Sequence, residues 1–309
     1  MTDSNNEINI KTLIGVLWAS KNVIACITLF FAVLSVIISL MIPNMYISKA
    51  ILAPVQAEDS LTSGLGKYSR LASLSGVNLP DGATQKTLEA IERIKSFEFF
   101  SNYIIPNVKL ENIMAVNKWE PKENSITYKD EIYNYENKQW VRNVKFPKRP
   151  KPSTQEAFEE FKKIFSVAQD KNQFVIITVK HKSPEVAKNW LDIIIYNINE
   201  SMREIDKYNA ENSINYLNDI SKTINVQSLK EVTANLLEEQ METLMLAASN
   251  KSYVFKTIES PIVSEKKISP NRPLICIMVT LLGALFSILA VLVSFRFNEL
   301  NEVYAQDSH

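Results

Sequence analysis

Two long uncharged segments constrain this chain more than any other feature. Residues 23–42 (VIACITLFFAVLSVIISLMI) and residues 274–295 (LICIMVTLLGALFSILAVLVSF) run for 20 and 22 residues without a charged side chain. About 20 apolar residues in a helix cross the hydrocarbon core of a bilayer, and a helix satisfies its own backbone hydrogen bonds in lipid. We therefore expect two transmembrane helices.

Each segment has an alternative interpretation. A cleaved signal peptide would have a shorter apolar stretch, of about 7–15 residues, followed by a small-residue cleavage site. The first segment is instead followed by Pro43 and Tyr46, which favours a retained anchor. The second segment could be the core helix of a soluble protein, but it runs directly into Arg296 and a short tail, which favours a span.

Two spans put both ends of the chain on one side of the membrane. The expected organisation is a short segment over 1–22, a large folded domain over 43–273 on the opposite side, and a tail over 296–309. Lys and Arg residues near the membrane do not decide the orientation, because long loops cross regardless of charge. Cys26 and Cys276 both lie in the spans, and the large loop has no cysteine, which suits an oxidising compartment.

The first half of the chain predicts several further elements. Residues 7–22 have an amphipathic pattern that suits a helix lying in the membrane interface. Residues 46–53 alternate as a strand does, and residues 84–105 carry an apolar helical stripe that ends at Pro106. That stripe consists of Leu88, Ile91, Ile94, Phe97 and Phe99.

Strands or an extended excursion are expected over 118–146, followed by a Pro-rich link over 147–153. Ser153 with Glu156 forms a capping box that opens a helix running to about Phe165.

The second half predicts a long helical arm. Residues 173–181 read as a strand, and Ser183, Pro184 and Glu185 then supply a cap, a first-turn proline and an acid facing the helix dipole. The helix should run over 184–224, and a second helix over about 228–248 should return along it. Residues 253–259 read as a closing strand. The expected class is α+β, with an α/β base and a projecting helical hairpin over about 184–248.

Few residues suggest chemistry. The formal net charge is zero and the chain has only 6 glycines, which argues against nucleic-acid binding and a glycine-rich nucleotide fold. Residues 64–68 superficially resemble a phosphate-binding loop but lack its spacing and its Ser or Thr. His181 and His309 are the only histidines, and His181 at a strand end is expected to be structural. We assign no catalytic, cofactor-binding or metal-binding residue.

Four aromatic residues leave two interpretations open. They could stack on sugar rings, but packing between strands is the favoured interpretation. These residues are Tyr128, Tyr133, Tyr135 and Trp140.

The second span carries candidate contact residues. Gly283 and Ser287 have the small-xxx-small spacing that allows close helix packing, and they could contact another helix of the chain, a second copy or a polymerase. Ser35 and Ser39 repeat this spacing in the first span. Just before the second span, Pro270 and Pro273 belong to a segment that either forms a rigid membrane re-entry strap or serves as a simple linker.

The order of these parts resembles the Wzz chain-length determinants, the polysaccharide co-polymerases of Gram-negative bacteria. The resemblance covers nearly the whole chain, and it depends on the order and spacing of segments that are individually loose. These are the lead-in before the first span, YISKAILAP at 46–54, YSRLASLSGVNL at 68–79, the helix at 88–105, VKHKSPEVAKNW at 179–190, and SPNRP at 269–273 with the glycine-bearing span.

The resemblance implies an inner-membrane protein with cytoplasmic termini and a periplasmic α/β base carrying a long arm. It implies a high-order homo-oligomer that sets the modal length of O-antigen or a related polysaccharide together with a Wzy-type polymerase. The lipid-linked growing polysaccharide is a further partner in this interpretation. No kinase domain is expected after residue 295. Members of the family have no agreed catalytic residues, and none is transferred.

Three function classes therefore compete. The first is a non-enzymatic regulator of polysaccharide length, for O-antigen or for another polymer such as a common antigen or capsule. The second is a two-span receptor for a periplasmic ligand, which would need an output domain larger than segments of 22 and 14 residues. The third is a membrane-anchored enzyme such as a glycosyl hydrolase, which net turnover on polysaccharide would reveal.

Overall fold

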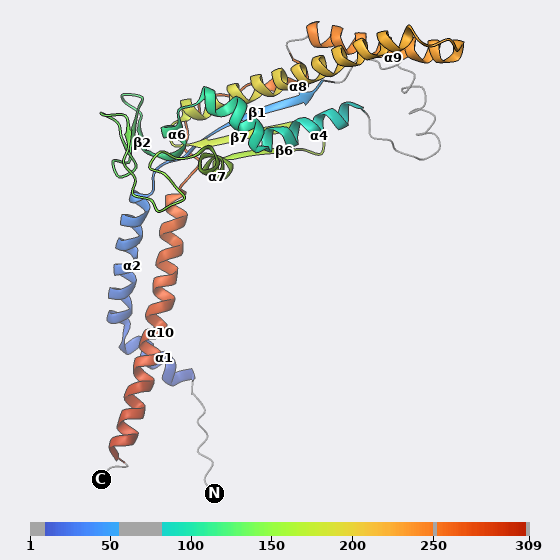
Figure 1. Ribbon diagram of the computed structural model, residues 1–309. Helices are drawn as coiled ribbons and strands as arrows, with labels where there is room; N and C mark the ends of the chain where they lie inside the picture. Colours follow the sequence, from blue (N-terminus) through green and yellow to red (C-terminus); the bar gives the residue numbers. More distant parts are fainter. Residues whose placement is uncertain (1–9, 56–81, 250–251, 307–309) are drawn as a thin grey trace. The chain divides into compact units, whose positions relative to one another are not determined.

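The computed structural model describes residues 10–55, 82–249 and 252–306. The chain divides into two units (Figure 1). The transmembrane unit comprises Met1–Asn44 and Lys267–His309, and the folded unit comprises Met45–Lys266.

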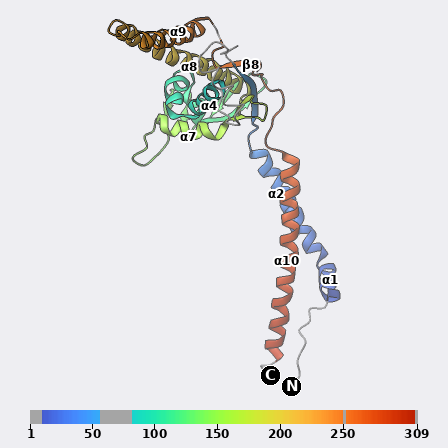
Figure 2. The ribbon, with the colours of Figure 1, turned by 90° about the vertical axis from the view of Figure 1, so that its right-hand side faces the viewer.

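The transmembrane unit is built on two long helices, α2 (Lys21–Met41) and α10 (Arg272–Gln306). Both are long and apolar enough to cross a membrane, and little of either apolar window is buried. The two helices lie side by side, as Figures 1 and 2 show. Exposed Leu, Ile, Val and Phe side chains cover their outer faces, which suits contact with lipid. The two expected transmembrane helices are confirmed as elements of the fold.

A short helix precedes the first span. The amphipathic lead-in forms α1 (Ile10–Ala19), and the chain then turns at Ser20 into α2. The carbonyl oxygen of Ser20 accepts hydrogen bonds from the amides of Val23 and Ile24, at 3.0 and 3.1 Å, which opens the next helix. At the other end of the unit, α10 continues past Phe295 to Gln306, because residues 296–306 contain no proline or glycine.

The folded unit centres on an antiparallel sheet with the order β6-β7-β1-β8. Its strands are β1 (Tyr46–Pro54), β6 (Phe165–Gln169), β7 (Val175–His181) and β8 (Phe255–Glu259). Tyr46 pairs with His181, and Leu52 pairs with Val175. Alternate residues of β1 and β7 are buried, as expected for strands with one face on the core. The expected strands over 46–53, 173–181 and 253–259 are confirmed.

The helix expected over 84–105 is wrong as a single element. α4 (Gly82–Lys95) ends just before Ser96. It is followed by α5 (Phe97–Phe99), a π-helical turn η1 (Phe100–Ile104) and a 3₁₀ turn η2 (Ile105–Asn107). Ser96 has an extended backbone, and its side chain accepts a hydrogen bond from the Phe99 amide at 3.1 Å, so it caps a new helix.

This break changes which side chains of the segment are buried. Phe99, Phe100 and Ile104 enter the core, together with Ile91 and Ile94 of α4. Leu88 and Phe97, which the expected stripe included, are 50% and 40% exposed.

An irregular excursion follows. It contains α6 (Leu110–Met114) and the two hairpins expected as strands over 118–146. These pair β2 (Val116–Glu120) with β3 (Ser125–Tyr128) and β4 (Tyr133–Asn134) with β5 (Gln139–Trp140).

The helix after the excursion has the predicted start. α7 (Thr154–Ile164) opens with the predicted capping box between Ser153 and Glu156. β6 begins directly at Phe165, where the sequence indicated only a helix end. It forms because it pairs with β7, from Phe165 opposite Val179 to Gln169 opposite Val175.

A helical hairpin completes the folded unit. α8 (Pro184–Ser221) has 38 residues, about 57 Å at the usual rise. Ser183 caps it as predicted, and α9 (Gln227–Ser249) packs along it (Figure 1). The first half of α8 is buried through Trp190, Ile194, Ile198 and Met202, whereas only Ala210 is buried beyond Asp206. The expected long arm is confirmed.

Candidate functional site

Gly283 lies where α10 approaches α2 closely. A Cβ atom at this position would lie 2.5 Å from Cβ and 2.6 Å from Cγ of Phe31. These distances are too short for real carbon contacts, so any side chain here must displace Phe31 or separate the helices. The geometry places Gly283 against the chain's own first span, which favours helix packing over direct contact with a polymerase.

Two buried serines of this helix pair bond within their own helices, and a third, Ser39, has a buried hydroxyl without a partner among the described residues. Ser287 is fully buried, and its hydroxyl donates to the Ala284 carbonyl oxygen at 2.7 Å. Ser35, also buried, donates to the Ala32 carbonyl oxygen at 2.6 Å. Ser39 is buried on the same helix. These small side chains therefore allow close packing rather than forming bonds between the helices.

The segment before the second span is tied to the end of the first. Pro270 is buried, and Pro273 is exposed at the second position of α10, where its missing amide hydrogen costs nothing. The Asn44 side-chain oxygen accepts hydrogen bonds from Lys267 at 3.4 Å and from Arg272 at 3.2 Å. Asn44 therefore holds the returning segment near the point where the first span ends.

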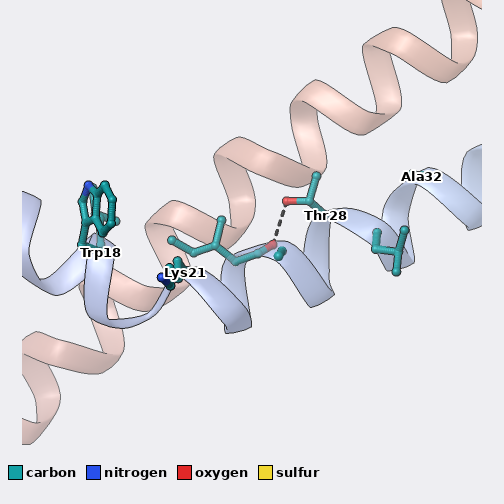
Figure 3. A pocket seen from close by; sticks show the side chains of 8 residues that line it. Trp18, Lys21, Thr28 and Ala32 are labelled. Atoms are coloured by element: carbon teal, nitrogen blue, oxygen red, sulfur yellow. Dashed lines mark hydrogen bonds between the residues drawn. The ribbon is translucent and has the colours of Figure 1, made fainter.

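An open groove runs between α1 and the start of α2 (Figure 3). Its volume is about 610 Å³, and its walls are largely apolar. The Lys21 ammonium lies 5.4 Å from the centre of the Trp18 ring, and Thr28 donates to the Ile24 carbonyl oxygen at 2.8 Å. The groove offers space for a hydrocarbon chain. Its lining residues are Leu17, Trp18, Lys21, Ile24, Ala25, Thr28, Leu29 and Ala32.

His181 is held in one tautomer by backbone groups. Its Nδ1 accepts a hydrogen bond from the Ser183 amide at 2.9 Å, so the proton resides on Nε2, which donates to the Asn112 carbonyl oxygen at 2.9 Å. The ring is 4% exposed and contacts Trp190. Burial lowers its pKa below 6.5, so the ring is neutral near pH 7. These contacts suit the structural role that we expected.

The described residues offer no metal site. Nowhere in the part of the chain that the structure describes do three or more His, Cys, Asp or Glu side chains gather as potential ligands. Residues 64–68, which superficially resemble a phosphate-binding loop, lie outside the described residues. Residues 68–79, one of the segments that resemble the Wzz family, also lie outside them.

Asn199 connects α8 to the segment that enters β8. Its Oδ1 atom accepts three backbone hydrogen bonds, from Tyr253 at 3.0 Å and from Val254 and Phe255 at 2.9 Å. Its Nδ2 donates to the Ile195 carbonyl oxygen at 3.0 Å. Asn199 is 7% exposed, so its side-chain amide group ties the segment that returns from the arm to α8 from a buried position. Asn199 was not singled out in the sequence, because its partners lie more than 50 residues away.

A second cluster marks the foot of the arm. Asp206 on α8 accepts hydrogen bonds from Lys86 at 2.7 Å and from the Tyr253 hydroxyl at 2.6 Å. Lys86 also lies over the Tyr253 ring, 5.3 Å from its centre. Burial and the bond to Asp206 raise the pKa of Tyr253, so this phenol remains a donor at physiological pH. The cluster connects α4, α8 and the approach to β8 where the buried half of α8 ends.

The four aromatic residues of the excursion pack on one another. Tyr128 contacts Tyr133 at 5.6 Å and stacks on Tyr135 at 5.4 Å, and Tyr133 contacts Trp140 at 5.0 Å. The Tyr128 hydroxyl donates to Asn112, and burial raises the pKa of Tyr128 to about 12. Only Tyr135 is largely exposed, at 65%. The arrangement supports strand packing, with Tyr135 the one ring open to a sugar.

The comparisons with known proteins add a family to this geometry. Residues 6–105 match the family described as Wzz: Chain length determinant protein. This N-terminal segment is similar to the Wzz family. The Wzz segment contains α1, α2, β1 and α4, so it includes the first span and the strand that follows it. The resemblance found in the sequence is confirmed, and the family is that of polysaccharide chain-length determinants.

Other comparisons give weaker likenesses. No curated protein matches the chain. Among solved structures, it is similar to a full-length bacterial polysaccharide co-polymerase, with 12% identity, a TM-score of 0.42 and coverage of 95% of this chain and 99% of that one. It is also similar to a fragment of WzzB from Salmonella Typhimurium, with 14% identity, a TM-score of 0.33 and coverage of 74% and 100%. Because both TM-scores are low, the Wzz assignment rests on residues 6–105.

Proposed function

We propose that this chain is a non-catalytic regulator of the modal length of a surface polysaccharide, namely lipopolysaccharide O-antigen. It would act in the bacterial inner membrane together with a Wzy-type polymerase. The observation that carries the proposal is the Wzz match over residues 6–105, which includes the first span and β1. The two spanning helices and the long arm agree with it.

The proposed topology places both termini in the cytoplasm and residues 43–273 in the periplasm. Helices α2 and α10 would each cross the membrane once, so the folded unit would lie entirely on one side. The lack of cysteine between Cys26 and Cys276 supports an oxidising compartment for that unit.

We further propose that the chain acts as a high-order homo-oligomer. The arm supports this, because α9 leaves several large apolar side chains without cover within the chain. Leu229, Val232, Met241 and Met245 are each at least 50% exposed. Exposed apolar helix faces are stabilised when they pack on another copy. Partner copies would then surround the space through which the lipid-linked polymer grows.

A deletion strain tests the proposed function. Polysaccharide from the parent, the deletion strain and the strain complemented with the intact chain is separated on a gel. Loss of the modal band with polymerisation intact, and its return on complementation, is the expected result. An unchanged profile in the deletion strain would refute the proposal. Shortening of all polymer to a single unit would indicate an enzyme or polymerase role. A profile change confined to a capsule or common antigen would assign another polysaccharide.

A further inference from the structure

A basic stretch without a single carboxylate runs from residue 137, just before β5, to the start of α7. Between Glu136 and Glu156 the sequence has no acidic residue and six cationic ones. These are Lys138, Arg142, Lys145, Lys148, Arg149 and Lys151. In a chain whose formal net charge is zero, this is a local concentration of positive charge that neither the fold nor the proposed function explains.

Arg142 closes this stretch into a defined loop. Its guanidinium group donates two hydrogen bonds to the Glu156 carboxylate, at 2.7 and 3.0 Å. It also donates to the carbonyl oxygens of Arg149 at 2.8 Å and Pro150 at 2.7 Å. The Arg142 and Glu156 side chains are only 13% and 16% exposed, and the hydrogen bond from Arg142 lowers the pKa of Glu156. Both ends of residues 143–152, the basic loop, are thereby fixed to the start of α7.

The charges of the basic loop are not neutralised by this closure. Arg142 is paired, but Lys145, Lys148, Arg149 and Lys151 form no ion pair with any residue in the described ranges. All four side chains are exposed. The Lys148 amide donates to the Lys145 carbonyl oxygen at 3.1 Å, and this turn brings the backbones of these two lysines together. The loop therefore presents four cations from a short, anchored segment.

Phe146 sits in the middle of these cations with almost no cover. It is 95% exposed, more than any other large apolar side chain in the described part of the chain, including those of the spans. A phenylalanine that makes no packing contribution to its own fold is suited to insertion into another apolar medium.

We propose that the basic loop docks on anionic phospholipid, with Phe146 inserted at the level of the acyl-chain boundary and the four cations on lipid phosphates. Aromatic side chains flanked by Lys and Arg bind anionic membrane surfaces through both apolar burial and electrostatic attraction. Lipid is favoured over an acidic polysaccharide because acyl chains can surround the whole Phe146 ring, whereas a sugar covers only one face of it. The two spans of the same chain tether the loop to a bilayer, so the loop meets lipid at a raised effective concentration.

The test uses the full chain in nanodiscs with an environment-sensitive probe. Cys26→Ser and Cys276→Ser remove the native thiols, and Phe146→Cys carries an NBD label. Nanodiscs contain either phosphatidylcholine alone or a mixture with phosphatidylglycerol. The same label on Tyr216→Cys, a position on α8 that is 67% exposed, is the matched control.

The label at residue 146 should shift to the blue in discs containing phosphatidylglycerol and should be quenched by spin-labelled lipid. Added salt should reverse the shift, and Lys148→Glu with Arg149→Glu should abolish it. The label at residue 216 should remain water-like. A second variant keeps Phe146 and carries the label on Asn143→Cys. This label should show the same lipid dependence, and the dependence should be lost when Phe146→Ala is added.

Two results would overturn the proposal. One is a label at residue 146 that remains water-like in both discs. The other is a label that remains water-like in discs but shifts when a soluble acidic polysaccharide such as alginate is added, which would make a polymer the ligand of the loop. Because the experiment depends only on insertion of the two spans, its outcome is independent of whether the chain controls polysaccharide length.

Discussion

Replacing Asn199 with Ala should weaken the folded unit more than most single substitutions do. The Oδ1 atom of Asn199 accepts hydrogen bonds from the amides of three consecutive residues, Tyr253 to Phe255. Val254 and Phe255 are 4% and 0% exposed, so water cannot replace the lost acceptor for them. Each buried donor left without a partner costs about 1–3 kcal/mol, so the two buried amides together give a loss of about 2–6 kcal/mol.

Asn199→Asp is the matched control. A carboxylate of nearly the same shape keeps the acceptor for the three amides. It replaces the donation to the Ile195 carbonyl oxygen with a second acceptor facing that oxygen, a repulsion that protonation of the carboxyl relieves. Asn199→Asp should therefore lose less stability than Asn199→Ala, and its loss should shrink as the pH falls and the carboxyl becomes protonated and regains a donor.

Thermal unfolding of the full chain in one detergent measures both variants. For a folded unit of this size, about 1 kcal/mol corresponds to about 2–4 °C in Tm, so Asn199→Ala should lower the midpoint by roughly 4–24 °C. Hydrogen exchange should show the earliest loss of protection at residues 253–255. The reasoning would be refuted if Asn199→Ala unfolded within about 3 °C of the parent, or if Asn199→Asp fell as far as Asn199→Ala.

Four further predictions follow from the same structure. Lowering the pH below about 6.5 should destabilise the folded unit, because the pKa of His181 is lowered in the folded state and the unfolded chain therefore binds the proton more readily. In unfolding curves recorded between pH 5 and 8, His181→Gln should reduce this pH dependence of stability. An equal pH dependence in both proteins would argue against this role of His181. The Gly283→Leu variant should still insert in the membrane, but it should separate α10 from Phe31 and shift or abolish the modal polysaccharide band. An unchanged band at matched expression would show that the face of α10 around Gly283 is dispensable for length control. Reporter fusions at Ser308 and Asn124 should give opposite signals, with the Ser308 reporter cytoplasmic; a periplasmic signal from Ser308 would reject the topology. Light scattering of the full chain in mild detergents should give a high-order oligomer, and a monomer in all of them would count against assembly through the arm.

The elements that the sequence predicted well are those with local causes. The two spans follow from length and lack of charge, and Ser183 and Ser153 mark helix starts through bonds to residues only three positions away. β6 was missed because its residues become a strand only through pairing with β7. The break at Ser96 was missed because a serine in a helical pattern does not show that Phe99 and Phe100 are needed in the core.

The candidate contacts divide in the same way. The small side chain of Gly283 indicated a close approach, but the sequence did not reveal that Phe31 occupies the facing position. Most of the basic loop was interpreted as a Pro-rich link over 147–153, and its first residues as the end of the excursion over 118–146, although its run of cations was visible. Its closure depends on a bond between Arg142 and Glu156, which lie 14 residues apart. Asn199 gave no signal at all, because a single asparagine in a helix is ordinary until its distant partners are known.

The most direct measurement of the central claim is a gain of function. The intact chain is produced in a strain that has an O-antigen polymerase but lacks any chain-length determinant, and its lipopolysaccharide is separated on a gel. A chain that regulates polymer length should convert an unregulated ladder into a cluster of bands around one preferred length, with total polymer little changed. A ladder that keeps its original distribution, with the chain inserted in the inner membrane at a level that matches a known determinant, would contradict the proposed function.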